Sequence, residues 1–175
     1  GRIRKKRAES LRQRTQWRWH LDEVFVKING ETRYLWRAVD HEGEVLAAYA
    51  TKKRNKAVAL RFLKKAMWRY GNPQIIVTDK LKSYGAAMRE IGNLQGQKTG
   101  RHLNNSAENS HLPFRRRERA MQRFRRMRNL QRFASMHASV YNHFNGDKHL
   151  NSRQNFKAYR SEALLEWRNL AQAAG

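Results

Sequence analysis

Three carboxylates in this chain could share one site: Asp22, Asp79 and Glu108. Asp79 follows closely on the β-branched run at residues 75–77, which has an Asn-Pro pair before it and is typical of a buried strand. The carboxyl end of such a strand is where open α/β sheets bind their ligands. Asp79 could instead cap the helix that we expect at residues 80–91. Its role therefore depends on whether the other carboxylates join it.

Three converging carboxylates would suit a magnesium site. Mg²⁺ binds a few carboxylates and takes its other ligands from water and phosphate oxygens. Two such ions, roughly 3.5–4 Å apart, can activate an attacking oxygen and stabilise a leaving oxygen in phosphodiester chemistry. Each acid also has an ordinary interpretation, because Asp22 could be a solvated strand residue and Glu108 a first-turn acid favoured by the helix dipole. Glu23, next to Asp22, is expected to face the opposite side of its strand.

The charge of the chain indicates a polyanionic partner. Its formal net charge is +24 and its pI is near 11.4, so nucleic acid is the expected ligand and an anionic membrane the alternative. No apolar run of 18 residues and no signal-peptide pattern is present, so we expect no membrane contact. The absence of cysteine excludes disulfides and thiolate zinc sites.

Strand-like segments dominate the first half of the chain. Val24, Val26 and Ile28 alternate along one such segment, and Asn29-Gly30 after it is a strong hairpin signal. We expect three antiparallel strands, a fourth strand that ends at Thr78 and a short fifth strand. The expected strands are residues 17–28, 33–39, 45–50, 75–78 and 101–103.

Helical spacing of apolar residues follows these strands and separates them. Asn55 is the expected N-cap of the first helix, and a polar loop is expected at residues 92–100. One long helical stretch, which Pro113 could kink or open, is expected at residues 114–144. The other expected helices are residues 55–70, 80–91, a start at 105–110, and about 161–171. The organisation that follows is a basic arm at residues 1–16, one α/β domain at 17–145 and a C-terminal helical extension at 146–175.

This order of elements resembles the ribonuclease H fold, in which a three-stranded antiparallel meander and two further strands are flanked by helices. In that topology an acid on the first strand lies beside the end of the fourth strand. A helix after the fifth strand can bring a third acid to both. Asp22, Asp79 and Glu108 occupy these three places.

Several motifs resemble the IS6 family of insertion-sequence transposases, which includes IS26- and IS240-like elements. They are Trp-His-Leu-Asp-Glu at residues 19–23, Tyr-Leu-Trp-Arg-Ala-Val-Asp at 34–40, Thr-Asp-Lys at 78–80, and Leu-Asn-Asn at 103–105 with Glu-Asn-Ser-His at 108–111. The resemblance implies a DDE catalytic domain of the ribonuclease H-like fold. It also implies that Asp22, Asp79 and Glu108 are the catalytic and metal-binding triad, holding two Mg²⁺ ions for which Mn²⁺ can substitute.

The resemblance further implies a DNA transposase that nicks an insertion sequence and transfers its end to target DNA. Family members bind their terminal repeats through an N-terminal helix-turn-helix, for which the segment before Trp17 is too short, so we expect a catalytic domain with a basic arm. The gap between the second aspartate and the glutamate, residues 80–107, is also shorter than in better-known members. The expected partners are transposon ends, target DNA and a second copy of the chain, in a homodimer or higher assembly on the nucleoid of the bacterial cytoplasm.

Two other functions remain open from the sequence. One is a ribonuclease H-type nuclease that cuts RNA–DNA hybrids without joining DNA. The other is a catalytically inactive DNA-binding remnant of a transposase, which would bind DNA in a salt-sensitive way and show no metal-dependent chemistry. The ordered set of three acids argues against the inactive remnant, whereas the missing end-binding region keeps that alternative open.

An arginine-rich segment is the expected DNA-binding surface. Residues 115–132 contain nine arginines and one glutamate, whereas a solvated helix face usually mixes both signs of charge. Arginine pairs well with phosphate through its planar fork. The expected DNA contacts are Lys80, Lys82, Arg115, Arg116, Arg117, Arg119, Arg125 and Arg126. Expected helpers that position DNA or water, or else serve as helix caps and core residues, are Asn104, Asn105, Asn109 and His111.

Overall fold

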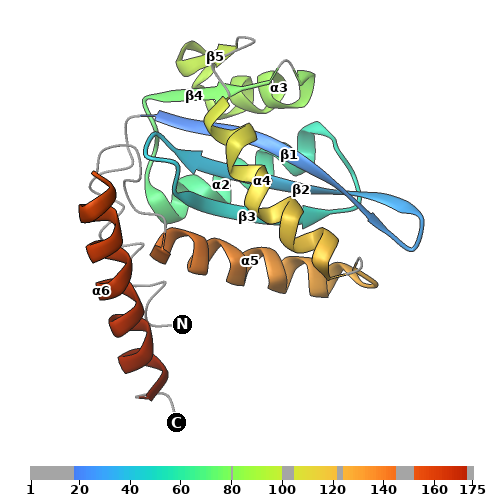
Figure 1. Ribbon diagram of the computed structural model, residues 1–175. Helices are drawn as coiled ribbons and strands as arrows, with labels where there is room; N and C mark the ends of the chain where they lie inside the picture. The colour runs from blue at the N-terminus through green and yellow to red at the C-terminus, as the bar shows by residue number, and fades with distance from the viewer. Residues whose placement is uncertain (1–17, 80, 100–104, 122–123, 145–151, 173–175) are drawn as a thin grey trace.

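The computed structural model describes residues 18–79, 81–99, 105–121, 124–144 and 152–172 of the 175 residues. In this part of the chain five strands form one mixed sheet in the order β3-β2-β1-β4-β5 (Figure 1). The strands are β1 (Arg18–Ile28), β2 (Glu31–Asp40), β3 (Val45–Thr51), β4 (Ile75–Thr78) and β5 (Gln97–Thr99). The helices are α2 (Lys56–Tyr70), α3 (Lys82–Ile91), the short 3₁₀ turn η1 (Leu94–Gly96), α4 (Asn105–Ala120), α5 (Met127–Phe144) and α6 (Arg153–Gln172). This is the α/β, ribonuclease H-like arrangement that the sequence predicted.

The β1–β2 hairpin begins the antiparallel meander. Asn29 and Gly30 at its tip have φ angles of 51° and 81°, which are the left-handed values that a tight two-residue turn requires. β2 then pairs antiparallel with β3, and β4 joins the other side of β1 as a parallel strand. β1 therefore lies in the middle of the sheet, with an antiparallel neighbour on one side and a parallel neighbour on the other.

Hydrophobic cores cover both faces of the sheet. On one face, α2 and α3 pack against Trp19 and Leu21 of β1. On the other face, α4 and α5 pack against Val24 and Val26 of the same strand (Figure 1). This division follows from the period of two in a strand, which sends successive side chains to opposite faces.

The long helical stretch expected at residues 114–144 is wrong, because the chain forms two helices there. Pro113 lies inside α4 and does not end it. The break comes instead between α4 and α5, where Phe124 is buried and forms a β-bridge with Ile28. The spacing of Phe124 fits a helical stripe, but its backbone pairs with the end of β1.

Three other boundaries differ from the prediction. The fifth strand lies at Gln97–Thr99, inside the expected loop, and pairs with β4 although it is polar. Residues 101–103, where we expected that strand, lie outside the described residues. α3 begins at Lys82 and has Leu81 as its N-cap, so Asp79 is not the cap of this helix. α6 begins at Arg153, well before the expected start.

α6 packs against the end of α5 and points away from the sheet (Figure 1). The ring Nε2 of His143 lies 2.7 Å from the carbonyl oxygen of Ala163, and the ring of Trp167 lies against His143 and Phe144. In the described residues, no helix has the length and apolar character needed to cross a membrane.

Candidate active site

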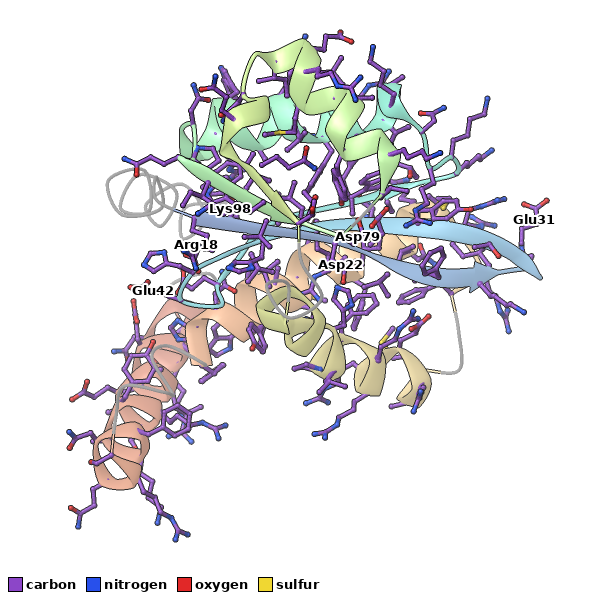
Figure 2. All side chains as sticks on the ribbon, turned by 90° about the horizontal axis from the view of Figure 1, so that it is seen from above. Arg18, Asp22, Glu31, Glu42, Asp79 and Lys98 are labelled. Atoms are coloured by element: carbon purple, nitrogen blue, oxygen red, sulfur yellow. The ribbon has the colours of Figure 1, made fainter. Side chains whose placement is uncertain are left out.

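The strand pairing of β1 and β4 brings two of the predicted acids together. Leu21 of β1 pairs with Thr78 of β4 in parallel register, so Asp22 and Asp79 each come one residue after a matched pair. Their carboxylates, together with that of Glu23, each offer an oxygen within 4.8 Å of the others. Figure 2 shows Asp22 and Asp79 beside each other near the middle of the sheet.

Local hydrogen bonds hold the two aspartates. Asp22 Oδ1 accepts a hydrogen bond of 2.7 Å from the backbone N–H of Glu23. Asp79 Oδ1 accepts one of 3.0 Å from the backbone N–H of Leu81, which turns the chain between β4 and α3. In each carboxylate the second oxygen, Oδ2, faces other groups of the site.

Glu23 is the member of the site that the sequence interpretation left out. It faces the α2 side of the sheet, as expected from strand alternation, but its side chain is only 1% exposed and reaches the acids at the strand end. Burial, with the nearby charges of Asp79 and Asp22, raises the pKa of Glu23 to about 7, while a hydrogen bond from Arg54 opposes the rise. Its Oε2 has no hydrogen-bond partner within the described part of the chain. The apolar neighbours of Glu23 in the sequence were the available signal, since an acid inside a buried strand needs a partner.

Arg54, in the segment between β3 and α2, is that partner. Its Nε donates to Glu23 Oε1 at 2.8 Å, and its Nη2 lies 3.5 Å from Asp79 Oδ2. One guanidinium thus contacts carboxylates from both β1 and the end of β4. Because the pair with Glu23 is largely buried, the loss of one partner would leave an uncompensated charge.

α4 approaches the site from the other face of the sheet. The Nε2 of His111 lies 3.5 Å from Asp22 Oδ2. Burial, with the charges of Arg37 and Arg115, lowers the pKa of His111 to about 3, so the ring is neutral near pH 7 and this polar contact is not an ion pair. Arg37 is buried on β2, opposite Asp22 in the β1–β2 register, and places a positive charge next to the site. Burial lowers the pKa of Arg37 to about 10, so it stays charged near pH 7.

The remaining predicted site residues are placed less completely. Glu108 belongs to α4 and comes three residues before His111, a spacing that puts two residues on one face of a helix. The side chains of Asn105, Glu108 and Asn109 lie outside what the structure describes, as do Lys80 and Asn104 altogether. The structure therefore brings together Asp22 and Asp79 directly, and brings the helix that carries Glu108 to Asp22 through His111.

The predicted DNA-contact residues mostly lie on the surface. Exposed members are Lys82 at the start of α3 and Arg116, Arg117, Arg119, Arg125 and Arg126 in and after α4. Arg115 is different, because its Nη1 donates to Glu118 Oε2 at 2.7 Å within α4. Its guanidinium is thus already paired with a carboxylate.

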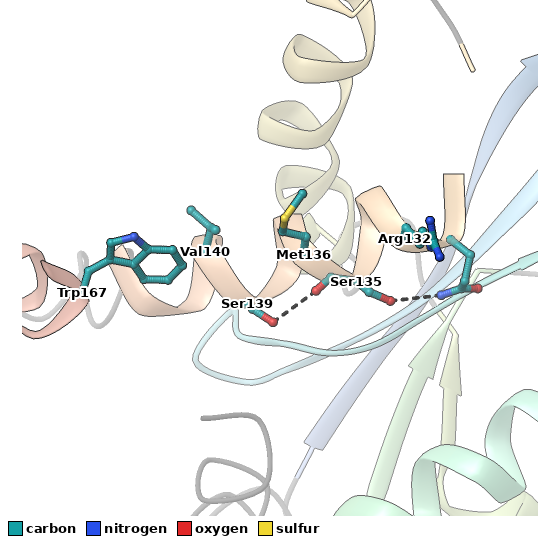
Figure 3. A pocket seen from close by; sticks show the side chains of 7 residues that line it. Arg132, Ser135, Met136, Ser139, Val140 and Trp167 are labelled. Carbon is teal, nitrogen blue, oxygen red and sulfur yellow. Dashed lines mark hydrogen bonds between the residues drawn. The ribbon is translucent and has the colours of Figure 1, made fainter. Parts of the chain in front are cut away.

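A groove of about 420 Å³ lies elsewhere, along α5 and next to Trp167 of α6 (Figure 3). It is lined by apolar and small polar side chains, among them Met136, Ser139 and Val140, and by no carboxylate. Ser139 and Gln131 are engaged in hydrogen bonds with Ser135. The groove is therefore not part of the acid site.

The donor set of the acid site fits a hard divalent cation. All three carboxylates offer oxygen, which Mg²⁺ and Mn²⁺ prefer, whereas softer metals select histidine or cysteine ligands. Among the described residues Glu23 Oε2 has no hydrogen-bond partner, and the charges of Asp79 and Asp22 help to raise the pKa of Glu23, so the carboxylates repel one another even beside Arg54. A cation in this place would relieve that repulsion.

The sheet order, with Asp22 on β1 beside Asp79 at the end of β4, is that of a ribonuclease H-like domain. Among solved structures, the catalytic core domain of BIV integrase matches with a TM-score of 0.51 and 14% identity over 87% of this chain and 99% of that chain. The HTLV-2 integrase catalytic core domain in complex with magnesium matches with a TM-score of 0.51 and 15% identity over 73% of this chain and 84% of that chain. At these identities the likeness shows the fold.

The chain belongs to the DDE domain family of IS240-type transposases, which matches residues 16–147. A curated relative is the transposase for the insertion sequence-like element IS431mec of Staphylococcus aureus, 34% identical over 100 residues, which cover 54% of this chain and 45% of the relative. An uncharacterized protein of Yersinia pseudotuberculosis, pYV0051, is 40% identical over 76 residues, covering 42% of this chain and 71% of that protein. The chain spans about half the length of the Staphylococcus transposases it matches. The predicted family is thereby confirmed.

Proposed function

We propose that this domain catalyses metal-dependent nicking and strand transfer of DNA at the end of an insertion sequence. The observation that carries the proposal is the convergence of Asp22, within β1, and Asp79, directly after the parallel strand β4, in a chain of the DDE domain family. Asp22 and Asp79 would hold the metal, with Glu108 completing the site from α4. We expect two Mg²⁺ ions, with Mn²⁺ able to substitute, and two copies of the chain acting on the two ends of the element.

The bound metal would supply Lewis-acid stabilisation of the attacking and leaving oxygens at phosphorus. The side chains of the domain have a different task, which is to hold the acids in place. Arg37 lies beneath Asp22, and Arg54 contacts Asp79, so each aspartate is oriented from a different side of the sheet. Neutral His111 contacts Asp22 without adding a charge that would repel a cation. In strand transfer the 3′-hydroxyl oxygen of one strand bonds to phosphorus of the target, and the bond from that phosphorus to its own 3′ oxygen breaks.

The exposed arginines of α4 and the segment after it would bind the DNA backbone. Arg116, Arg117 and Arg119 are exposed along one helix, where no base-specific contact is needed. If about six phosphates are neutralised, affinity should fall by roughly three orders of magnitude between 50 and 200 mM salt. Arg117→Gln should lower the salt slope by about 1, and Arg153→Gln, in α6, should leave it unchanged. A slope near zero for the unaltered chain would refute this surface.

Strand joining on a branched DNA that already carries an exposed 3′-hydroxyl tests the reaction itself. We expect joined product that requires Mg²⁺ or Mn²⁺, no product with Asp79→Asn, and normal product with Glu162→Gln, an exposed acid of α6. Hybrid cleavage without joining would identify a nuclease instead. Salt-sensitive DNA binding without chemistry in any variant would identify an inactive DNA-binding remnant.

A further inference from the structure

Phe25 is an exposed aromatic side chain next to the acid site. It lies two residues after Glu23 on β1, so both side chains project from the same face of the sheet. Its relative exposure is 47%, whereas Val24 and Val26 on either side are buried. Single exposed apolar residues are common on protein surfaces, so exposure alone does not indicate a binding site. The contacts of the Phe25 ring with the acid site are what distinguish it.

Arg54 joins the ring to the acids. The guanidinium carbon of Arg54 lies 5.1 Å from the centre of the Phe25 ring, while its nitrogens contact Glu23 and Asp79. Tyr34 meets the ring edge-on, with centroids 5.5 Å apart and planes at 69°. The ring is thus held in one orientation by a cation and an aromatic neighbour, and nearly half of the side chain remains open. Only the Arg54 guanidinium would separate a group stacked on that open part from Asp79.

We propose that Phe25 and Arg54 form a subsite for an unpaired nucleobase at the reacting end of the DNA. The Phe25 ring would stack on the base, and Arg54 would face the phosphate attached to it. An aromatic ring beside a cation is the arrangement that binds single-stranded nucleic acid, since every base presents a π face and every nucleotide a phosphate. Bases within a duplex are stacked on each other, so the subsite selects a nucleotide that is not paired. This inference rests on the proposed function for DNA as the substrate.

The substrate of the proposed reaction favours this ligand over a protein side chain. Asp22, Glu23 and Asp79 would repel a bare phosphate, and Arg54 is the cation placed between them and Phe25. Because the Arg54 guanidinium already pairs with Glu23 and Asp79, its part is to screen these acids, and the Phe25 ring supplies the main attraction for the base. Unpaired nucleotides occur where strands are nicked or branched, which are the substrates of strand transfer.

Photocrosslinking with 5-iododeoxyuridine tests the subsite, because this base crosslinks to aromatic residues on which it stacks. The iodinated base is placed at the unpaired 3′-terminal nucleotide of a branched DNA, and in a second substrate ten base pairs inside the duplex. We expect a crosslink to Phe25, located by mass spectrometry, from the terminal position only. Phe25→Leu should abolish it and weaken binding of the branched DNA about 10-fold, while duplex binding stays unchanged. Phe25→Trp should retain both the crosslink and the affinity for the branched DNA.

Trp68 provides the matched control, since it is the most exposed of the large hydrophobic side chains in the described residues and lies on α2. Trp68→Leu should leave the terminal crosslink unchanged. The absence of a crosslink to Phe25, or an equal affinity loss for duplex in Phe25→Leu, would overturn the subsite. A Phe25-dependent crosslink in a protein that joins no DNA would support the subsite and contradict the proposed reaction, so the two failures are distinguishable.

Discussion

Asp40→Asn should stabilise the protein relative to the unaltered chain, and it should do so by more at pH 8 than at pH 5. Asp40 is completely buried at the end of β2. Its Oδ1 accepts hydrogen bonds from the backbone N–H groups of Glu42 at 3.0 Å and Glu44 at 2.9 Å. Its Oδ2 is buried with no hydrogen-bond partner among the residues that the structure describes. Asparagine keeps the accepting oxygen and removes the buried charge.

The size of the effect follows from the pKa of Asp40, which is raised to about 7 by burial and by the neighbouring Glu44 and Glu42 charges, against the backbone hydrogen bonds. A folded-state pKa above the unfolded value of about 3.9 means that the folded protein holds the proton more tightly. The stabilising contribution is therefore present in full below about pH 4 and is lost as pH rises towards 7. Between pH 5 and pH 8 the loss amounts to about 3 kcal/mol, since one pKa unit corresponds to about 1.4 kcal/mol.

Urea denaturation at pH 5 and pH 8, followed by fluorescence of the buried Trp19 and Trp36, measures this difference. We expect the free energy of unfolding of Asp40→Asn to exceed that of the unaltered chain at pH 8 and to approach it at pH 5. Glu162→Gln controls for a change of net charge alone. A variant that is less stable at pH 8, or a difference that does not change with pH, would refute the reasoning.

Three further substitutions test how the scaffold is held. Asn142→Ala should cost about 2–3 kcal/mol in urea denaturation, because the buried Asn142 amide accepts from the backbone N–H of Val45 at 2.9 Å and donates to its carbonyl at 3.0 Å; a loss below 0.5 kcal/mol would contradict this. Asn55→Ala should cost about 1 kcal/mol, since Asn55 caps α2 through the N–H of Val58 at 3.1 Å, and Asn55→Asp should restore most of it. Leu63→Ala should cost about 2–5 kcal/mol because Leu63 is fully buried between α2 and the sheet, and a wild-type melting temperature would exclude that packing.

The parts of the fold that the sequence predicted are those where apolar periodicity and turn residues agree. The β1–β2 hairpin combines alternating side chains with Asn29-Gly30, and α2 combines an apolar stripe with the Asn55 cap. β5 was misplaced because its three residues are polar and are defined by pairing with β4, which leaves no trace in periodicity. The α4–α5 break was missed for a similar reason, since Phe124 fits a helical stripe but pairs with Ile28.

The candidate site shows the same limit. Asp22 and Asp79 could be predicted because Asp22 lies within a recognisable strand and Asp79 directly follows another, in an order that matches a known topology. The buried position of Glu23 had a signal in its apolar neighbours, but its partner Arg54 could not be predicted, because the contact joins residues 31 positions apart. Local sequence patterns describe one element at a time, whereas a buried ion pair depends on where two elements meet.

The division of β1 between two cores has a consequence for how the site can be altered. Asp22 faces the core built by α4 and α5, whereas Glu23 faces the core built by α2 and α3. Neighbouring acids are thus supported by separate sets of side chains, and the backbone links them through the hydrogen bond from the Glu23 N–H to Asp22 Oδ1. Repacking one core should therefore move its own carboxylate most, so each side of the sheet offers a separate way to adjust the spacing of the acids.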